Sequence, residues 1–326
     1  MPASVFRCAA LAAALLTATG AGADTAYVTN QSSDDLSVVD LTSMRVVATI
    51  PIGGKPAGVA VPPDGRHAYV TSPESGTLTV IDTEAARVAR RIEVKGGPLG
   101  VAVHPSGAPV YVADWYAHRL SVVDPEDGRI IAEVATGLSP SGVAVSPDGK
   151  LVVTADRDSN RISVFETGKM ALVGTVAVGE RPFGVEFSPD GSRLHVANVV
   201  SNDVSIVDVA SLATVASVPV GDRPYATATA SGRVFATDQH GATVSVFDAE
   251  TFAPVGTVDV GEYPEGIAAA GDGRALYVVN WFDNTLMKID AATLQLVSEV
   301  TVGDGPRAFG KFVAYDGGQG LSLIHI

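Results

Sequence analysis

Short apolar runs separated by turn residues make up most of the chain. In residues 179–208, GERPFGVEFSPDGSRLHVANVVSNDVSIVD, a Gly-x-x-Pro turn precedes the first apolar run, a Pro-Asp-Gly turn the second and a polar loop the third. A fourth run, TVASVPV, follows. Each run has the length of a strand, is rich in Val and Ile, and is bounded by residues that favour turns. The pattern predicts four β-strands in this unit and no long helix.

This unit repeats along the chain with an almost constant period. Its third run ends on an acid every 42 residues from Asp40 onward, except for one step of 40 residues between Asp208 and Asp248. The turn proline keeps the same spacing from Pro56 to Pro306. Repeats of roughly 40 to 50 residues that hold four strands are typical of β-propeller blades. The seven copies predict an all-β, seven-bladed β-propeller with four-stranded antiparallel blades.

The order of the strands at the two ends predicts how the ring closes. The chain enters the repeat at its second strand, residues 26–30, and its last repeat element, residues 306–313, matches a first strand. We therefore expect the C-terminal strand to complete the N-terminal blade. Closure of this kind leaves no open repeat end, so loss of the residues after Arg307 is expected to destabilise the whole ring.

Residues 1–23 have the pattern of an export signal. Arg7 precedes an apolar run, and Ala-Gly-Ala stands before Asp24 as a small-residue cleavage site. Cleavage after Ala23 would remove Cys8, the only cysteine, and leave a mature chain that needs no disulfide. We predict a periplasmic or secreted protein.

Composition predicts one globular unit over residues 24–314. The chain is 46% hydrophobic and carries a formal net charge of -14, which disfavours contact with nucleic acid or anionic lipid. We expect a monomer with no membrane insertion. Residues 315–326 fall outside the repeat and end in the apolar GLSLIHI. We interpret them as a tail, and the residues after Gly320 as candidates for non-native sequence.

Several of the repeated segments resemble the YVTN-type β-propeller repeat family, and YncE-like exported propellers in particular. AYVTN at 26–30 and AYVTS at 68–72 carry the likeness, together with LSVVD, TVSVFD, TIPIG and SPDG, and it covers nearly all of residues 25–313. The resemblance implies a bacterial exported or surface seven-bladed propeller. It implies no single chemistry, because related rings include lactonases, haem d1-binding domains, amine dehydrogenase chains and interaction scaffolds.

One mouth of the predicted channel is the expected binding face. In a propeller, the loops after the second strands and the turns before the first strands gather there. The small polar residues that end the second strands are Asn30, Ser72, Asp114, Asp156, Asn198, Asp238 and Asn280. They either form a polar mouth that attracts cations or cap their own turns. The second alternative is favoured, because such side chains commonly accept backbone N–H groups.

Two aromatic pairs depart from the repeat. Trp115 with Tyr116 and Trp281 with Phe282 follow that polar position in repeats three and seven, where residues 31–32, for example, are Gln-Ser. Repeats three and seven lie nearly opposite in a seven-membered ring, so we expect the pairs to face one another across the mouth. Exposed Trp and Tyr suit a flat, apolar or sugar-like ligand or a protein partner. The alternative is that each pair packs on a neighbouring loop as a lid over the core.

Charged and aromatic residues flank the turn prolines. They are Lys55, Arg181, Phe183, Arg223, Tyr225, Tyr263, Glu265 and Arg307. Arginines here could clamp a carboxylate or phosphate. The favoured alternative is a set of solvated ion pairs with the acids at the preceding turn position, which are worth little. Those acids are Glu180, Asp222, Glu262 and Asp304.

His118 and His240 lie in the same group of loops and could serve as ligands or bases. No pair of histidines has the spacing of metal ligands, so no metal site is predicted. No catalytic residue and no cofactor are predicted either, although haem or quinone stays open.

The leading interpretation is a non-enzymatic exported propeller that binds a small ligand or protein partner at the aromatic-lined mouth. The alternative is a lactonase-like hydrolase or a cofactor-binding partner of a periplasmic dehydrogenase. An enzyme needs acids, bases and nucleophiles that converge. The alternative therefore predicts that His118, His240, Asp114 and Asp238 surround one cavity.

Overall fold

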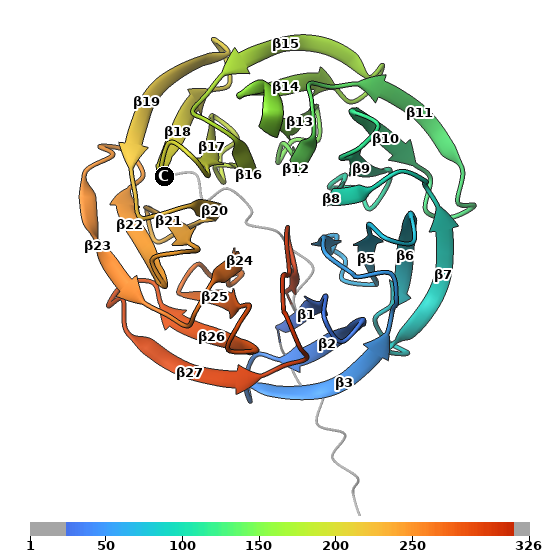
Figure 1. The fold of residues 1–326 in the computed structure, drawn as a ribbon, viewed down its shortest axis with the longest axis horizontal. Helices are drawn as coiled ribbons and strands as arrows, with labels where there is room; N and C mark the ends of the chain where they lie inside the picture. Colours follow the sequence, from blue (N-terminus) through green and yellow to red (C-terminus); the bar gives the residue numbers. More distant parts are fainter. Residues whose placement is uncertain (1–23, 316–326) are drawn as a thin grey trace, which may run out of the picture.

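The computed structural model describes residues 24–315, which form seven four-stranded antiparallel sheets arranged as the blades of a ring (Figure 1). Blades 2 to 4 each use four strands that are consecutive in sequence. Blade 2 holds β4 (Val59–Ala60), β5 (His67–Ser72), β6 (Thr77–Asp82) and β7 (Arg87–Glu93). Blade 3 holds β8 (Pro98–Val103), β9 (Val110–Asp114), β10 (Arg119–Val123) and β11 (Ile130–Ala135). Blade 4 holds β12 (Pro140–Val145), β13 (Leu151–Asp156), the 3-10 turn η1 (Arg157–Ser159), β14 (Arg161–Glu166) and β15 (Ala171–Ala177).

Blades 5 to 7 follow the same plan, and blade 1 joins the two ends of the described chain. Blade 5 holds β16 (Pro182–Phe187), β17 (Arg193–Asn198), β18 (Asp203–Asp208) and β19 (Ala213–Pro219). Blade 6 holds β20 (Pro224–Ala230), β21 (Arg233–Asp238), β22 (Thr243–Asp248) and β23 (Pro254–Asp259). Blade 7 holds β24 (Pro264–Ala269), β25 (Ala275–Asn280), β26 (Thr285–Asp290) and β27 (Leu296–Thr301). Blade 1 holds β28 (Val313–Ala314), β1 (Thr25–Asn30), β2 (Asp35–Asp40) and β3 (Arg45–Pro51). The predicted seven-bladed propeller is confirmed.

Each blade is buried near the axis and exposed at its outer strand. In blade 5, β17 and β18 are buried along most of their length, whereas β19 is mostly exposed. Apolar side chains from neighbouring blades share clusters: Val28 of blade 1, Val70 of blade 2 and Tyr277 of blade 7 lie in one of them. The core therefore lies between blades, which is why the inner strands show no clean alternation of apolar and polar residues.

Glycines let the inner strands of adjacent blades approach closely. A Cβ on Gly184 of β16 would lie 2.5 Å from the carbonyl oxygen of Tyr225 in β20. Gly142 of β12 would meet the Phe183 carbonyl oxygen at the same distance. The close approach at these glycines brings the preceding residue, which directly follows the turn proline, near the next inner strand. Side chains from several blades can therefore reach the axis.

Buried threonines hold the same inner strands from the neighbouring blade. The Oγ1 atoms of Thr29, Thr71 and Thr237 donate to the carbonyl oxygens of residues 57, 99 and 265, at 2.8, 2.6 and 2.9 Å. In each case the acceptor follows a turn proline in the next blade. The threonines therefore set the position of the residues that form the channel mouth.

The closing segment confirms the predicted ring closure but is less regular than a normal inner strand. The β28 strand pairs with β1, and the N–H of Arg307 donates to the Thr29 carbonyl oxygen at 2.8 Å. The same segment also contacts blade 2, because the Val59 N–H donates to the Phe309 carbonyl oxygen at 2.9 Å. Gly310, with φ of 121°, breaks the extended conformation between these contacts. The closing segment, residues 306–314, thus ties blade 1 to blade 2.

The small polar residues that end the second strands are all buried, so they do not form the less favoured alternative, a polar mouth that attracts cations. Asp156, for example, accepts hydrogen bonds from Thr154 Oγ1 at 2.7 Å and from Ser163 Oγ. In blade 5, Asn198 Nδ2 donates to Ser205 Oγ at 2.9 Å. Asp114 caps its own turn, since its Oδ1 accepts the N–H groups of Tyr116 and Ala117 at 3.2 and 3.0 Å. The whole set is Asn30, Ser72, Asp114, Asp156, Asn198, Asp238 and Asn280.

The predicted export signal, residues 1–23, and residues 316–326 of the predicted tail lie outside the described residues. Tyr315 is described, and its hydroxyl donates to the Ala269 carbonyl oxygen at 2.8 Å. Within residues 24–315, no helix has the length and apolar character that crossing a membrane requires.

Candidate ligand-binding site at the channel mouth

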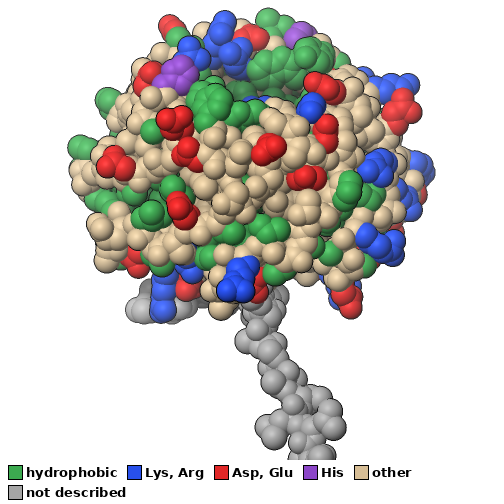
Figure 2. Space-filling view, turned by 60° about the horizontal axis from the view of Figure 1, so that its bottom comes forward, with side chains coloured by type: hydrophobic (Ala, Val, Ile, Leu, Met, Phe, Trp, Pro, Cys, Tyr) green, Lys and Arg blue, Asp and Glu red, His purple; other side chains and the backbone are tan. Residues whose placement is uncertain are grey.

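The loops after the second strands and the turns before the first strands meet at one face, as expected. The N–H of Trp115 donates to the Gly97 carbonyl oxygen, and the N–H of Trp281 donates to that of Tyr263, both at 3.0 Å. We call this face the mouth face. Figure 2 shows hydrophobic side chains gathered at the top of the molecule, beside Lys, Arg and His side chains.

The turns at this face hold residues with positive φ just before the prolines. Arg181, Arg223 and Tyr263 have φ of 54°, 56° and 58°. A neighbouring loop supports the conformation: the N–H of Arg181 donates to Asn160 Oδ1 at 2.9 Å. Non-glycine residues adopt this region only where local hydrogen bonds favour it. The turns are therefore defined structures that hold their side chains at the rim.

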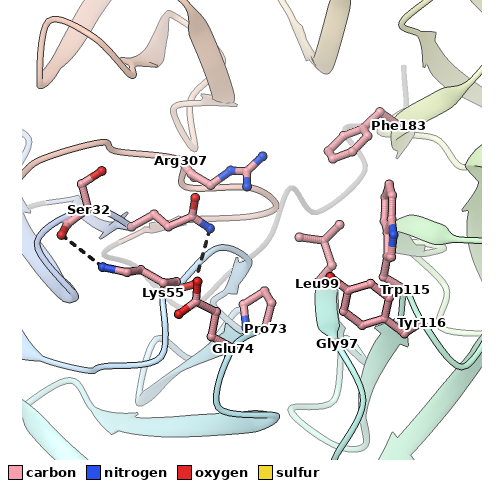
Figure 3. Close-up of a pocket in the computed structure, with 11 residues that line it drawn as sticks. Ser32, Lys55, Pro73, Glu74, Gly97, Leu99, Trp115, Tyr116, Phe183 and Arg307 are labelled. Atoms are coloured by element: carbon pink, nitrogen blue, oxygen red, sulfur yellow. Dashed lines mark hydrogen bonds between the residues drawn. The ribbon is translucent and has the colours of Figure 1, made fainter.

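A cavity of about 590 Å³ opens at the mouth face (Figure 3). Its described lining residues come from blades 1, 2, 3 and 5 and from the closing segment. Figure 3 shows aromatic and aliphatic side chains on one side and polar or charged side chains on the other. The lining residues are Gln31, Ser32, Lys55, Pro73, Glu74, Gly97, Leu99, Trp115, Tyr116, Phe183 and Arg307.

The apolar wall is built on blade 3. Trp115 is half-buried, with its ring centroid 6.2 Å from that of Phe183 and the Arg157 guanidinium 5.3 Å from its ring. Tyr116 is 73% exposed and lies over Gly97, where a Cβ would be 2.5 Å from the tyrosine ring. The wall therefore combines a fixed tryptophan with a solvent-exposed tyrosine.

An aromatic plug lies at the inner end of the cavity. The ring centroid of Phe183 is 4.4 Å from that of Tyr225 and 5.0 Å from that of Phe309. These three side chains are buried and come from blade 5, blade 6 and the closing segment. Because blade 5 and the closing segment are not neighbours in the ring, their contact places the plug on the axis.

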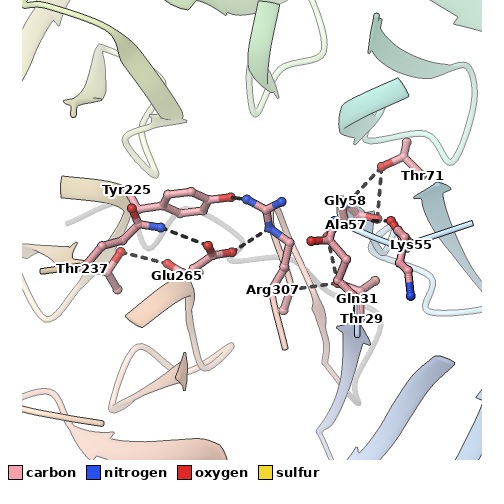
Figure 4. A network of polar contacts seen from close by, with 12 residues as sticks. Thr29, Gln31, Lys55, Ala57, Gly58, Thr71, Tyr225, Thr237, Glu265 and Arg307 are labelled. Atoms are coloured by element: carbon pink, nitrogen blue, oxygen red, sulfur yellow. Dashed lines mark hydrogen bonds and ion pairs between the residues drawn. The ribbon is translucent and has the colours of Figure 1, made fainter. Parts of the chain in front are cut away.

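Arg307 forms the charged wall and is fixed by buried partners (Figure 4). Its Nε donates to Glu265 Oε2 and its Nη2 to the Tyr225 hydroxyl, both at 2.7 Å. Gln239 Nε2 donates to the other oxygen of Glu265 at 3.0 Å. The guanidinium also lies 5.5 Å from the Trp281 ring. This network crosses from the closing segment to blades 6 and 7.

Burial is the largest influence on the pKa values of Glu265, Tyr225 and Arg307. It raises the pKa of Glu265, and the neighbouring Arg307 guanidinium opposes that shift. It also raises the pKa of the Tyr225 hydroxyl well above its ordinary value. Burial by itself would lower the pKa of Arg307, but the Glu265 carboxylate raises it further, so the arginine keeps its charge. The 2.7 Å contact between Arg307 Nε and Glu265 Oε2 makes these two residues a buried ion pair at the wall of the cavity.

The matching family model is described as YNCE-like beta-propeller, and it covers residues 3–105 and 102–323. The chain belongs to the YncE-like β-propeller family. No curated protein matches its sequence.

Solved structures share the fold of this YncE-like propeller at low sequence identity. A functionally unknown protein from Desulfotomaculum acetoxidans is 18% identical with a TM-score of 0.78, over 90% of this chain and 99% of that one. Hydrazine synthase from Kuenenia stuttgartiensis is 22% identical with a TM-score of 0.70, over 77% and 87%. The dihydro-heme d1 dehydrogenase NirN, in complex with DHE, is 17% identical with a TM-score of 0.65, over 87% and 74%. These similarities show the fold alone.

The YncE-like propeller brings four of the predicted site residues into one cavity: Trp115, Tyr116, Phe183 and Arg307. Tyr225 lies beneath them in the plug. The second aromatic pair does not line the cavity, although Trp281 packs on Arg307, which does. The two aromatic pairs therefore do not face each other across one cavity. Their link is Arg307, which lines the cavity with the first pair and packs on Trp281 of the second.

The remaining predicted residues lie elsewhere on the mouth face. Tyr263 lies between His240 and Phe282, with ring centroids 5.7 and 5.2 Å away. His118 lies in the turn after β9, and its Nδ1 accepts the Ser139 N–H at 2.9 Å. Those outside the cavity are His118, Arg181, Arg223, His240, Tyr263, Trp281 and Phe282.

Two expected ion pairs have different partners. Arg307 pairs with buried Glu265 rather than Asp304, and Arg181 lies 3.9 Å from Asp158 rather than beside Glu180. In both cases the partner belongs to the preceding blade: Glu265 lies in blade 7, next to the closing segment, and Asp158 lies in blade 4, next to blade 5.

The four groups named by the enzyme alternative do not surround one cavity. Asp114 and Asp238 are buried within their blades, and neither His118 nor His240 lines the cavity. Among the described residues, no three His, Cys, Asp or Glu side chains are grouped in a way that could hold a metal ion.

Sequence reasoning missed several lining residues, among them Gln31, Glu74 and Leu99. Leu99 carried a usable signal, since it follows a turn proline at the position of Phe183 and Arg307. Gln31 and Glu74 carried none, because polar residues are common in such loops. Only the curvature of the ring brings them beside blade 3.

Proposed function

We propose that this YncE-like propeller is a non-enzymatic binding module whose small ligand enters the mouth cavity. The observation that carries the proposal is the cavity itself, about 590 Å³ with an apolar wall opposite a charged one. Ligand sites are commonly concave and mostly apolar, with a few polar groups that orient the ligand. Because the aromatic plug packs against the lining residue Phe183, we expect the ligand to enter from the mouth face.

Binding is favoured over catalysis because the buried titratable groups beside the cavity are bonded to one another. Arg307 donates hydrogen bonds to both Glu265 and the Tyr225 hydroxyl. A general acid or base must be free to exchange a proton with the substrate. A group already held by a buried ion pair suits recognition better than proton transfer.

We further propose that the mature protein begins after Ala23 and works in the periplasm or outside the cell, without a resident cofactor. The export pattern of residues 1–23 supports the location. N-terminal sequencing of the protein from its native compartment tests it: a first residue other than Asp24 would contradict the cleavage site.

A redox-associated propeller is the second candidate. Two proteins with the same fold are named hydrazine synthase and dihydro-heme d1 dehydrogenase, and this observation is the reason to test for a pigment. An absorption spectrum of the natively purified protein decides between the two candidates. Binding without a cofactor predicts a colourless protein, whereas a Soret or quinone band would favour the redox candidate.

The same purified protein tests the binding proposal. We expect mass spectrometry to find one small molecule that travels with it in a stoichiometric amount. A macromolecular partner that stays bound while the cavity is vacant would contradict the small-ligand proposal and favour a scaffold. Repeated purifications that contain neither would argue against a binding module.

A further inference from the structure

Arg307 keeps donors for a ligand although it is fixed. A guanidinium has five N–H donors, and the bonds to Glu265 and Tyr225 use two of them. The side chain is 19% exposed and lines the cavity. It therefore presents part of a charged, planar donor set to whatever occupies the cavity.

The arginine is also held in place before any ligand arrives. Glu265 and Tyr225 hold it by hydrogen bonds, and the Trp281 ring packs against it at 5.5 Å. An arginine fixed in this way loses little conformational entropy when it binds an anion. The buried Glu265 fixes the guanidinium and leaves its outer edge for the ligand.

The opposite wall suits a flat, apolar ring. Trp115, Tyr116 and Leu99 lie on one side of the cavity in Figure 3, and Arg307 and Lys55 lie on the other. Lys55 Nζ is 3.0 Å from Asp34 Oδ2. Glu74 is the acid among the described lining residues, and its exposure lets water screen its charge. The walls therefore offer ring stacking on one side and cationic donors on the other.

We propose that the cavity selects a planar aromatic or conjugated ring that carries a carboxylate. The ring lies against Trp115 and Tyr116, and the carboxylate accepts hydrogen bonds from Arg307, with Lys55 as a second cation. This inference rests on the proposed binding function and names the class of its ligand.

Matched acids and amides test the class directly. 1-Naphthoate and anthracene-2-carboxylate are each titrated against their carboxamides, with calorimetry or quenching of tryptophan fluorescence as the readout. A charge-assisted hydrogen bond is worth more than a neutral one, so each acid should bind about tenfold to a hundredfold more tightly than its amide. Equal affinities for acid and amide, or no binding of either acid, would overturn the proposal.

Two single variants test the charges without disturbing the buried pair, and one double variant replaces that pair by neutral groups. Lys55→Met should weaken binding of the acids by about threefold to tenfold and leave the amides unchanged. Glu74→Gln should tighten binding of the acids by about twofold to threefold, and less at high salt. The double variant Arg307→Gln with Glu265→Gln keeps the net charge and should reduce the preference for acids to the part that Lys55 supplies, about threefold to tenfold. An undiminished preference in a folded double variant would contradict the role of Arg307.

The outcomes separate this inference from the proposed function. If Tyr116→Ala loses a native small molecule that wild type retains, but the acids bind no more tightly than their amides, the inference is wrong and the binding function stands. If the acids bind more tightly than the amides but Tyr116→Ala has no effect, they bind outside the cavity and the inference is wrong.

Discussion

Single side chains at the inner strands set the chemistry of the mouth. Residues after the turn prolines occupy equivalent positions, yet they range from Ala57 to Phe183 and Arg307. The large ones fill the axis or line the cavity, and in several blades the glycine that follows lets the blades approach. The same backbone position therefore serves packing in some blades and recognition in others.

The buried ion pair gives the first prediction at this scale. Arg307→Met should lower the free energy of unfolding by about 3–5 kcal/mol, because it leaves the Glu265 carboxylate buried without its partner. Adding Glu265→Gln should restore much of that loss, since the remaining groups are neutral. Urea denaturation measures both. A double variant that is no more stable than the single one would show that the pair is not the source of the effect.

Two aspartates give a second prediction, with opposite signs. Burial raises the pKa of Asp238. The wild-type protein therefore loses stability as pH rises from about 4 through that raised pKa, because the buried carboxyl group becomes charged. Above about pH 4, the Asp238→Asn protein should be more stable than wild type. Hydrogen bonds from Thr251 lower the pKa of Asp248, so its contribution is present above about pH 4 and is lost as pH falls through the lowered pKa. Asp248→Asn should therefore lose stability at neutral pH.

Thermal unfolding of both variants from pH 3 to pH 7 provides the measurement. Each variant is the control for the other, because both replace a carboxylate by an amide in blade 6. Asn already stands at the position of Asp238 in three other blades, at residues 30, 198 and 280, so the substitution fits the local geometry. The same sign for the two variants would contradict the assigned causes.

At the scale of elements, the closing segment is less regular than the inner strands of blades 3 to 7. Its regular part is only β28, and it divides its contacts between blades 1 and 2. The sequence predicted the closure, because the order of strands at the two ends allows no other partner. It did not predict the irregularity, which comes from Gly310 and from contacts that no other blade makes.

Truncation tests this element. A chain that ends at Arg307 should lose the cooperative unfolding transition of the whole ring, because blades 1 and 2 lose their shared strand. A chain that ends at Tyr315 keeps every described contact of the segment and should unfold within about 0.5 kcal/mol of the full mature chain. If hydrogen exchange shows that only blade 1 of the truncated chain loses protection, closure is not the basis of ring stability.

At the scale of the whole molecule, the repeat explains how much could be predicted. The 42-residue period fixes the number of blades and the face on which the loops lie. Departures from the repeat also identified Trp115 and Tyr116, which line the cavity. It could not show that Glu265, Tyr225 and Arg307 meet, because they come from different repeats and touch only after the ring closes.

The central claim is that the mouth cavity, rather than the mouth face in general, binds the ligand. Tyr116 and Phe282 are a matched pair for this test, since both are exposed aromatic side chains at equivalent positions, at 73% and 63%, and only Tyr116 lines the cavity. Neither substitution to Ala should change the stability by more than about 0.5 kcal/mol.

The deciding measurement is native mass spectrometry of the ligand retained by wild type, Tyr116→Ala and Phe282→Ala after purification from the native compartment. We predict wild-type occupancy for Phe282→Ala and at least about a tenfold weaker affinity for Tyr116→Ala. Equal retention by the two variants, or equal loss, would contradict binding in the cavity.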